Sequence, residues 1–233
     1  AGGEETLVIP GWSGEAQRAT QDQQILPAVP VEVGHPTGAI EQGQQCRPAV
    51  DGSAQAGGLL GAEAYAASPI YPLARTAAVI NLDPHVVLPA ARDVELIGGG
   101  RTELELRLAE AAARLGLRVT LEPNPEAGWY FRSDHFPFAK RGVPAIAFRA
   151  GRDLVDGGTA AGNAIVGPYN ARDYHQTTDE FDPTWTFAGT VQEATVAFEL
   201  GRAIANDGSW PGWYPGIEYG AVRAASEAER AAK

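Results

Sequence analysis

Residues 76–82 read TAAVINL, a mostly apolar stretch followed directly by Asp83. A run of this length without polar alternation suits a strand that is buried on both faces, as in a parallel sheet. Residues 143–148 have the same character, and shorter strands are predicted at 94–97 and 117–121. Because helical segments alternate with these strands, the sequence predicts an α/β fold in which a mostly parallel sheet lies between helices. Ligand sites in such folds lie at the carboxyl ends of the strands.

The clearest helix signal begins at Thr102. Together with Glu105 it has the Ser/Thr-x-x-Glu form of a capping box, in which the two side chains satisfy backbone N–H groups of the first turn. Leucine and alanine residues then recur at helical spacing until Gly116. We therefore predict an amphipathic helix over residues 104–115.

Two further helices are predicted downstream. A short helix over 134–140 has Ser133 in position to cap it, and a longer helix over 188–206 closes the domain. Residues 151–178 are rich in glycine, and we predict one long loop there. Loops of that length inside a domain usually have a function.

The charge balance excludes several classes of partner. Lys and Arg number 18 against 29 Asp and Glu, which gives a formal net charge of −11 at pH 7. Such a chain repels nucleic-acid phosphates and anionic membrane surfaces. Its apolar runs are far shorter than the roughly 20 residues of a membrane-spanning helix, and its single cysteine, Cys46, excludes an intrachain disulfide. We therefore expect neither nucleic acid nor a membrane as a partner.

Carboxylate, imidazole and phenol groups gather in three segments that are predicted to follow strands. These groups are Asp83 with His85, Asp134 with His135, and Tyr174 with His175, Asp179 and Glu180. Carboxylate oxygens and imidazole nitrogens are ligands that Zn²⁺ takes in proteins. Each residue alone also suits a structural role, because an Asp after a strand often caps a turn and a loop His is often simply solvated.

Two other sites are excluded by the sequence. The glycines at 98–100 are not followed by the Lys-Ser/Thr of a phosphate-binding loop, so we predict a turn. The segment 6–12 (TLVIPGW) is typical of the start of an α/β serine hydrolase, but none of the serines lies in a Gly-x-Ser-x-Gly motif.

Five segments in order resemble the di-zinc aminopeptidases related to bacterial leucine aminopeptidase and glutamate carboxypeptidase. They are GLLGAEAYA (58–66), VINLD (79–83), RSDHFPFAKRGVPA (132–145), DYHQTTDEFD (173–182) and LGRAIAN (200–206). The resemblance implies a metallopeptidase-like α/β domain, of the phosphorylase/hydrolase-like type, over residues 53–220. Residues 1–52 then form a loop-rich segment in which we recognise no family motif, and residues 221–233 form a helical tail.

The resemblance also implies a site with two zinc ions and a bridging water. In it, Asp83 corresponds to a ligand of one zinc and His175 to a ligand of the other. Tyr174 corresponds to the hydroxyl that stabilises the tetrahedral intermediate, and Asp179 is expected to orient His175. The residues expected to line the substrate pocket are Arg132, Ser133, Asp134 and His135.

The sequence departs from the family pattern upstream of the GLLG segment. Gln55 stands where the family has its general base, and Ala56 stands where it has a zinc-binding Glu. Glutamine has nearly the shape of glutamate but does not accept a proton at neutral pH. His35 lacks the family's His-x-Asp pattern, and Asp51 lies too close to Gln55 to be the bridging carboxylate. Of five expected ligands, the sequence shows two.

These observations leave three hypotheses. The first is a zinc aminopeptidase that releases N-terminal residues of peptides with impaired turnover. The second is a non-catalytic homologue that binds peptides or a partner, and the third is a truncated fragment of such an enzyme. The resemblance favours a secreted or periplasmic protein.

Overall fold

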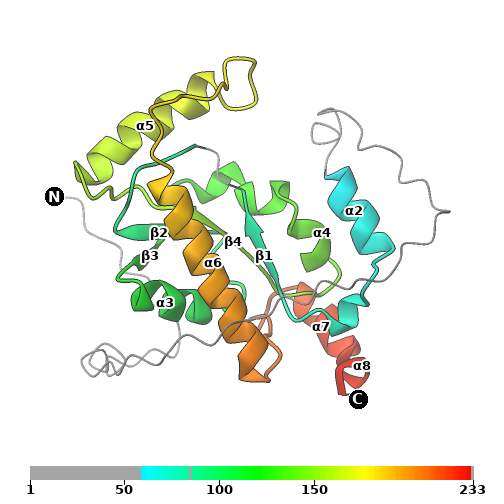
Figure 1. Ribbon diagram of the computed structural model, residues 1–233. Helices are drawn as coiled ribbons and strands as arrows, with labels where there is room; N and C mark the ends of the chain where they lie inside the picture. Colours follow the sequence, from blue (N-terminus) through cyan, green and yellow to red (C-terminus); the bar gives the residue numbers. More distant parts are fainter. Residues whose placement is uncertain (1–58, 84–85, 232–233) are drawn as a thin grey trace, which may run out of the picture. The chain divides into compact units, whose positions relative to one another are not determined.

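The computed structural model describes residues 59–83 and 86–231 (Figure 1). The strands are β1 (Val79–Leu82), β2 (Asp93–Ile97), β3 (Arg118–Leu121) and β4 (Ala145–Ala150). The α-helices are α2 (Leu60–Ala67), α3 (Leu104–Arg114), α4 (Phe136–Ala139), α5 (Gly158–Arg172), α6 (Ala188–Asp207), α7 (Tyr219–Ala225) and α8 (Glu227–Ala231). Short 3-10 helices are η1 (Leu73–Arg75), η2 (Pro125–Ala127) and η3 (Trp129–Arg132).

The sheet has the strand order β1-β4-β2-β3. Strand β1 runs parallel to β4, with Leu82 opposite Phe148, and β2 runs parallel to β3. The central pair β2 and β4 is antiparallel. The sheet is therefore a mixed one in which most strand pairs are parallel. The predicted α/β class is confirmed.

One face of the sheet packs against α3 and α6, which Figure 1 shows on the side of the strands opposite α4. The side chains of this core are Val94, Leu96, Ile146 and Phe148 from the sheet, Leu104, Leu108, Ala111 and Ala112 from α3, and Val196, Leu200 and Ile204 from α6. These positions alternate along each strand, as expected where successive side chains point to opposite faces.

The other face is covered by η3 and α4. There, Ile97 and Ala147 pack against Tyr130 of η3, and Ala145 packs against Ala139 of α4. Because β1 and β4 are parallel, both of their carboxyl ends emerge at the same edge beside η3. This edge is where the sequence predicts the site.

The capping box at the start of α3 is confirmed. The hydroxyl of Thr102 accepts a hydrogen bond from the Leu104 N–H at 2.8 Å, and the Glu105 carboxylate accepts one from the Thr102 N–H at 3.1 Å. The same carboxylate also accepts from the N–H groups of Gly100 and Arg101. The predicted glycine turn is therefore present, and the Glu105 carboxylate accepts the hydrogen bonds of the N–H groups of Gly100 and Arg101.

The predicted loop over residues 151–178 is wrong, because helix α5 occupies most of it. Only Gly162 and Val166 of this helix are buried, so it has no apolar periodicity that the sequence could display. Gly162 is required by packing, since a Cβ there would lie 2.2 Å from the Arg152 carbonyl oxygen. The glycines that suggested a loop are thus partly a consequence of close helix packing.

The short helix predicted over 134–140 is confirmed in part. Helix α4 spans only Phe136–Ala139, and Ser133 does not cap it with its side chain. The Ser133 hydroxyl instead donates to the Trp129 carbonyl at 3.1 Å and so holds the preceding turn. The later helix is confirmed as α6.

Near the C-terminal end, helices α7 and α8 follow one another between Tyr219 and Ala231. The segment 1–52 lies outside the described residues. Within residues 59–83 and 86–231, no helix has the length and apolar character needed to span a bilayer.

Candidate functional site

A small open pocket lies at the carboxyl ends of β1 and β4. Its lining residues are Asn81, Asp83, Ile97, Trp129, Ser133, Ala147, Phe148 and Arg149. Asn81 pairs with Ala147 in the parallel ladder, so the next alternate residues, Asp83 and Arg149, project from the same face. Strand geometry thus brings two charged groups to the pocket.

Asp83 is electrostatically coupled to the other predicted site residues. Burial of its carboxyl group raises its pKa, the charge of Asp134 raises it further, and His175 lowers it. Asp134 and His175, which lie 51 and 92 residues beyond Asp83 in the sequence, therefore both act on the Asp83 carboxyl group. The fold brings together the three segments in which the sequence placed its candidate ligands.

His175 has a strained backbone. Its φ is 60°, in the left-handed region, where a residue with a Cβ costs about 1–2 kcal/mol. Its ring stacks on Tyr174 with the ring centroids 3.9 Å apart. Strain of this kind is often found at functional sites, and here it fixes the direction of the one exposed imidazole in the described part of the chain.

Tyr174 lies between the predicted ligand and the pocket wall. Burial raises the pKa of its hydroxyl, the charge of Asp83 raises it further, and Arg132 and Arg149 oppose both effects. The hydroxyl is therefore protonated at neutral pH. The Tyr174 ring also meets Trp129 edge to face, with centroids 5.5 Å apart.

The four residues expected to line the substrate pocket lie in different environments. Ser133 lines the pocket, and Asp134 acts on Asp83. Arg132 lies over the ring of Trp129, 5.0 Å from its centroid. His135 is fully buried against Tyr130, with ring centroids 4.5 Å apart, so its placement does not support a substrate contact.

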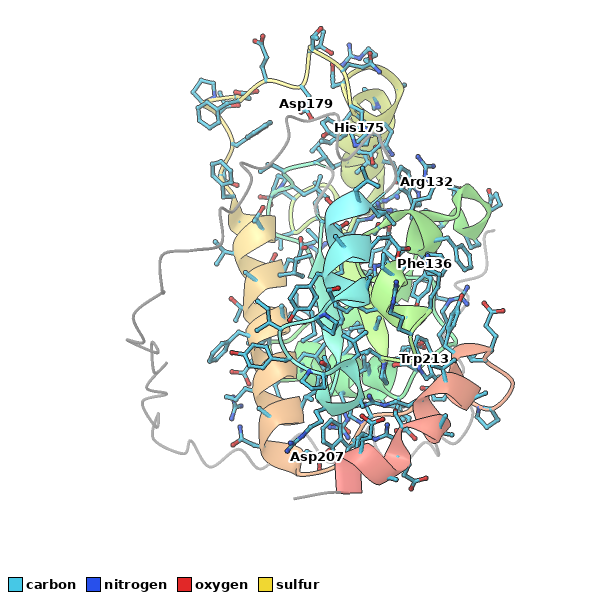
Figure 2. The ribbon with its side chains drawn as sticks, turned by 90° about the vertical axis from the view of Figure 1, so that its right-hand side faces the viewer. Arg132, Phe136, His175, Asp179, Asp207 and Trp213 are labelled. Atoms are coloured by element: carbon cyan, nitrogen blue, oxygen red, sulfur yellow. The ribbon has the colours of Figure 1, made fainter. Side chains whose placement is uncertain are left out.

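Asp179 lies near His175, and Figure 2 shows the two at one end of the domain, with Arg132 below them and Trp213 and Asp207 towards the other end. The Asp179 carboxylate accepts a hydrogen bond from the Tyr169 hydroxyl at 2.9 Å. The Tyr169 ring in turn packs against Tyr174. The structure therefore connects Asp179 to the site through Tyr169, and the prediction that Asp179 orients His175 stays a prediction.

Two charged residues at the site were not predicted. Arg149 donates from Nε to the buried carboxylate of Glu95 at 2.7 Å, and Arg152 pairs with the same carboxylate at 3.0 Å. Glu193 of α6 accepts from the Ala150 N–H at 3.1 Å. A signal for Arg149 exists in the sequence, because it is the one charged residue in the strand AIAFRA.

The pKa of Glu193 is raised to about 7. Burial is the main cause, and the nearby charge of Asp83 adds to it, while the Ala150 hydrogen bond and Arg149 oppose it. Its second carboxylate oxygen has no hydrogen-bond partner within residues 59–83 and 86–231. A buried acid therefore lies behind the pocket edge.

The donor set fits a metal only in part. Across the described ranges, no cluster of three or more His, Cys, Asp or Glu side chains is placed to hold an ion. Asp83 and His175 supply one carboxylate and one imidazole, which are ligands suited to zinc. Gln55, Ala56, His35, Asp51 and His85 lie outside the described residues.

Peptidase family M28 matches residues 5–198, which make up most of the chain. The chain therefore belongs to peptidase family M28, whose members are in general zinc-dependent peptidases. The match begins within the segment where we recognised no family motif. No curated protein and no solved structure gave a significant match.

Proposed function

We propose that this protein is a zinc-binding member of the family that recognises the N-terminal residue of a peptide, with impaired hydrolysis. The observation that carries the proposal is the electrostatic coupling of Asp83 with Asp134 and His175 at the carboxyl end of β1. Aminopeptidase specificity rests on the resemblance of the RSDH and DYHQ segments.

Zinc at this site would polarise the scissile carbonyl and lower the pKa of a bound water. Asp83 and His175 would hold the metal. The Tyr174 hydroxyl, protonated at neutral pH, would donate to the oxygen that becomes negative in the tetrahedral intermediate. Stacking on His175 and the edge contact with Trp129 keep its ring in place.

The impairment follows from Gln55 and Ala56. A glutamine cannot take the proton of the attacking water, and an alanine cannot bind a metal. These two residues favour a second candidate function, a non-catalytic homologue that holds peptides in the same pocket. Both candidates use the pocket beside Asp83, and they differ in whether a peptide bond is cleaved.

Bound zinc distinguishes the two candidates. The purified protein, dialysed against buffer with about one equivalent of zinc per site and then against metal-free buffer, is analysed for metal content. We expect substoichiometric zinc, because two recognised ligands cannot complete the tetrahedral shells of two ions. A protein that holds no zinc after both dialyses would contradict the metallopeptidase proposal and favour the peptide-binding alternative.

A further inference from the structure

Trp129 forms one wall of the pocket beside Asp83. It is the first residue of η3, directly after Gly128, whose φ of 67° turns the chain. The Tyr174 ring meets it edge to face at 5.5 Å, and the guanidinium of Arg132 lies 5.0 Å from its ring centroid. Contacts of both kinds stabilise an indole ring in one orientation.

The opposite surface of the pocket consists of sheet residues that cannot move. Ile97, Ala147 and Phe148 are all buried, with at most 6% of their surface exposed, and Ile97 and Ala147 pack against Tyr130. Their backbones are fixed by the β2–β4 ladder. The width of the pocket is therefore set by the side that belongs to η3.

The pocket is small for a ligand site. The space inside it that a water-sized group can occupy is about 10 Å³, which is roughly the room that one water needs. Its lining combines the apolar side chains of Ile97, Ala147, Phe148 and Trp129 with the polar or charged ones of Asn81, Asp83, Ser133 and Arg149. This arrangement suits one short apolar side chain next to a polar backbone.

We propose that Trp129 determines the specificity of this pocket by limiting it to a small apolar side chain, such as that of alanine. The inference rests on the proposed function, in which the first residue of a peptide lies beside Asp83. A phenylalanine side chain in that position would have to displace the indole from its contacts with Tyr174 and Arg132.

The test compares wild type with Trp129→Ala, Trp129→Phe and Trp185→Ala. Trp185 is a matched control, because it packs on Phe181 and Phe187 in the segment before α6 and is not a lining residue. Binding of L-alaninamide, L-leucinamide and L-phenylalaninamide is measured by saturation-transfer NMR with zinc present. Thermal unfolding of each variant establishes that it is folded.

We expect wild type and Trp185→Ala to bind the alanine amide in preference to the phenylalanine amide. In Trp129→Ala, the ratio of the affinities for the alanine and phenylalanine amides should shift by at least about tenfold in favour of phenylalanine. Tenfold is the lower end of the discrimination that one methylene group gives in a hydrophobic pocket. The affinity ratio of Trp129→Phe should lie between those of wild type and Trp129→Ala. This second variant keeps the test decisive if Trp129→Ala does not fold. An unchanged ratio in both Trp129 variants overturns the role of Trp129, whereas wild-type protein that binds none of the amides overturns the proposed function as well.

Discussion

Hydrolysis of amino-acid p-nitroanilides by the unmodified chain stays at the background rate, even with added zinc. The expected reason is chemical, because the resemblance aligns Gln55 with the family's general base. A positioned general base is typically worth about 10²–10⁴ in rate. The same resemblance aligns Ala56 with a zinc-binding Glu of the family, and alanine cannot bind a metal.

The control for this prediction is the restored pair Gln55→Glu and Ala56→Glu. Its rate should rise only slightly, because the upstream His-x-Asp and bridging Asp are not recognisable in residues 1–52. The assay is run with and without a chelator for both proteins. A robust, chelator-sensitive rate in the unmodified chain would show that the correspondence through the GLLG segment is mistaken.

His135 contributes stability that is lost in acid. This side chain is fully buried, and burial, aided by the charge of Arg101, lowers its pKa to about 4. The unfolded chain takes up the proton near pH 6.5, so the free energy of unfolding falls as the pH drops from about 6.5 to 4. The loss from this one group approaches about 3 kcal/mol.

The matched variant is His135→Phe, which keeps an aromatic ring against Tyr130 and has no charge at any pH. Between pH 7 and pH 4, the free energy of unfolding measured with urea should fall by about 3 kcal/mol less in the variant than in wild type. The comparison between proteins is essential, because Glu193, with its pKa raised to about 7, contributes a slope of the opposite sign. Equal losses in both proteins would contradict the buried, neutral state of His135.

The sequence predicts the sheet and its helices well where local signals and burial agree. The strand at 76–82 and the capping box at Thr102 are examples, since each depends on side chains that act within one element. It does not predict α5, whose few buried residues leave no periodicity and whose glycines serve packing against Arg152. Packing of that kind is decided by residues far along the chain.

In the candidate site, too, local motifs predict some residues, whereas the placement of others depends on packing. Asp83 and His175 are chosen from family motifs, and the charge of His175 lowers the pKa of Asp83. The burial of His135 and the position of Trp129 depend on how η3 folds against the sheet, which no local motif specifies. The contact of Asp179 with Tyr169 likewise depends on helix α5.

Calorimetric zinc titration of wild type, Asp83→Asn, His175→Ala and Asp207→Asn tests the central claim most directly. Asp207 is a matched control, because it pairs with Arg107 at the end of α6 away from His175 (Figure 2). We predict weak zinc binding in wild type and Asp207→Asn, and binding at least about tenfold weaker in the other two variants, since even removing a residue that supports a ligand costs about 10–100-fold. Two tight zinc sites that survive both the Asp83 and the His175 substitutions would contradict the account.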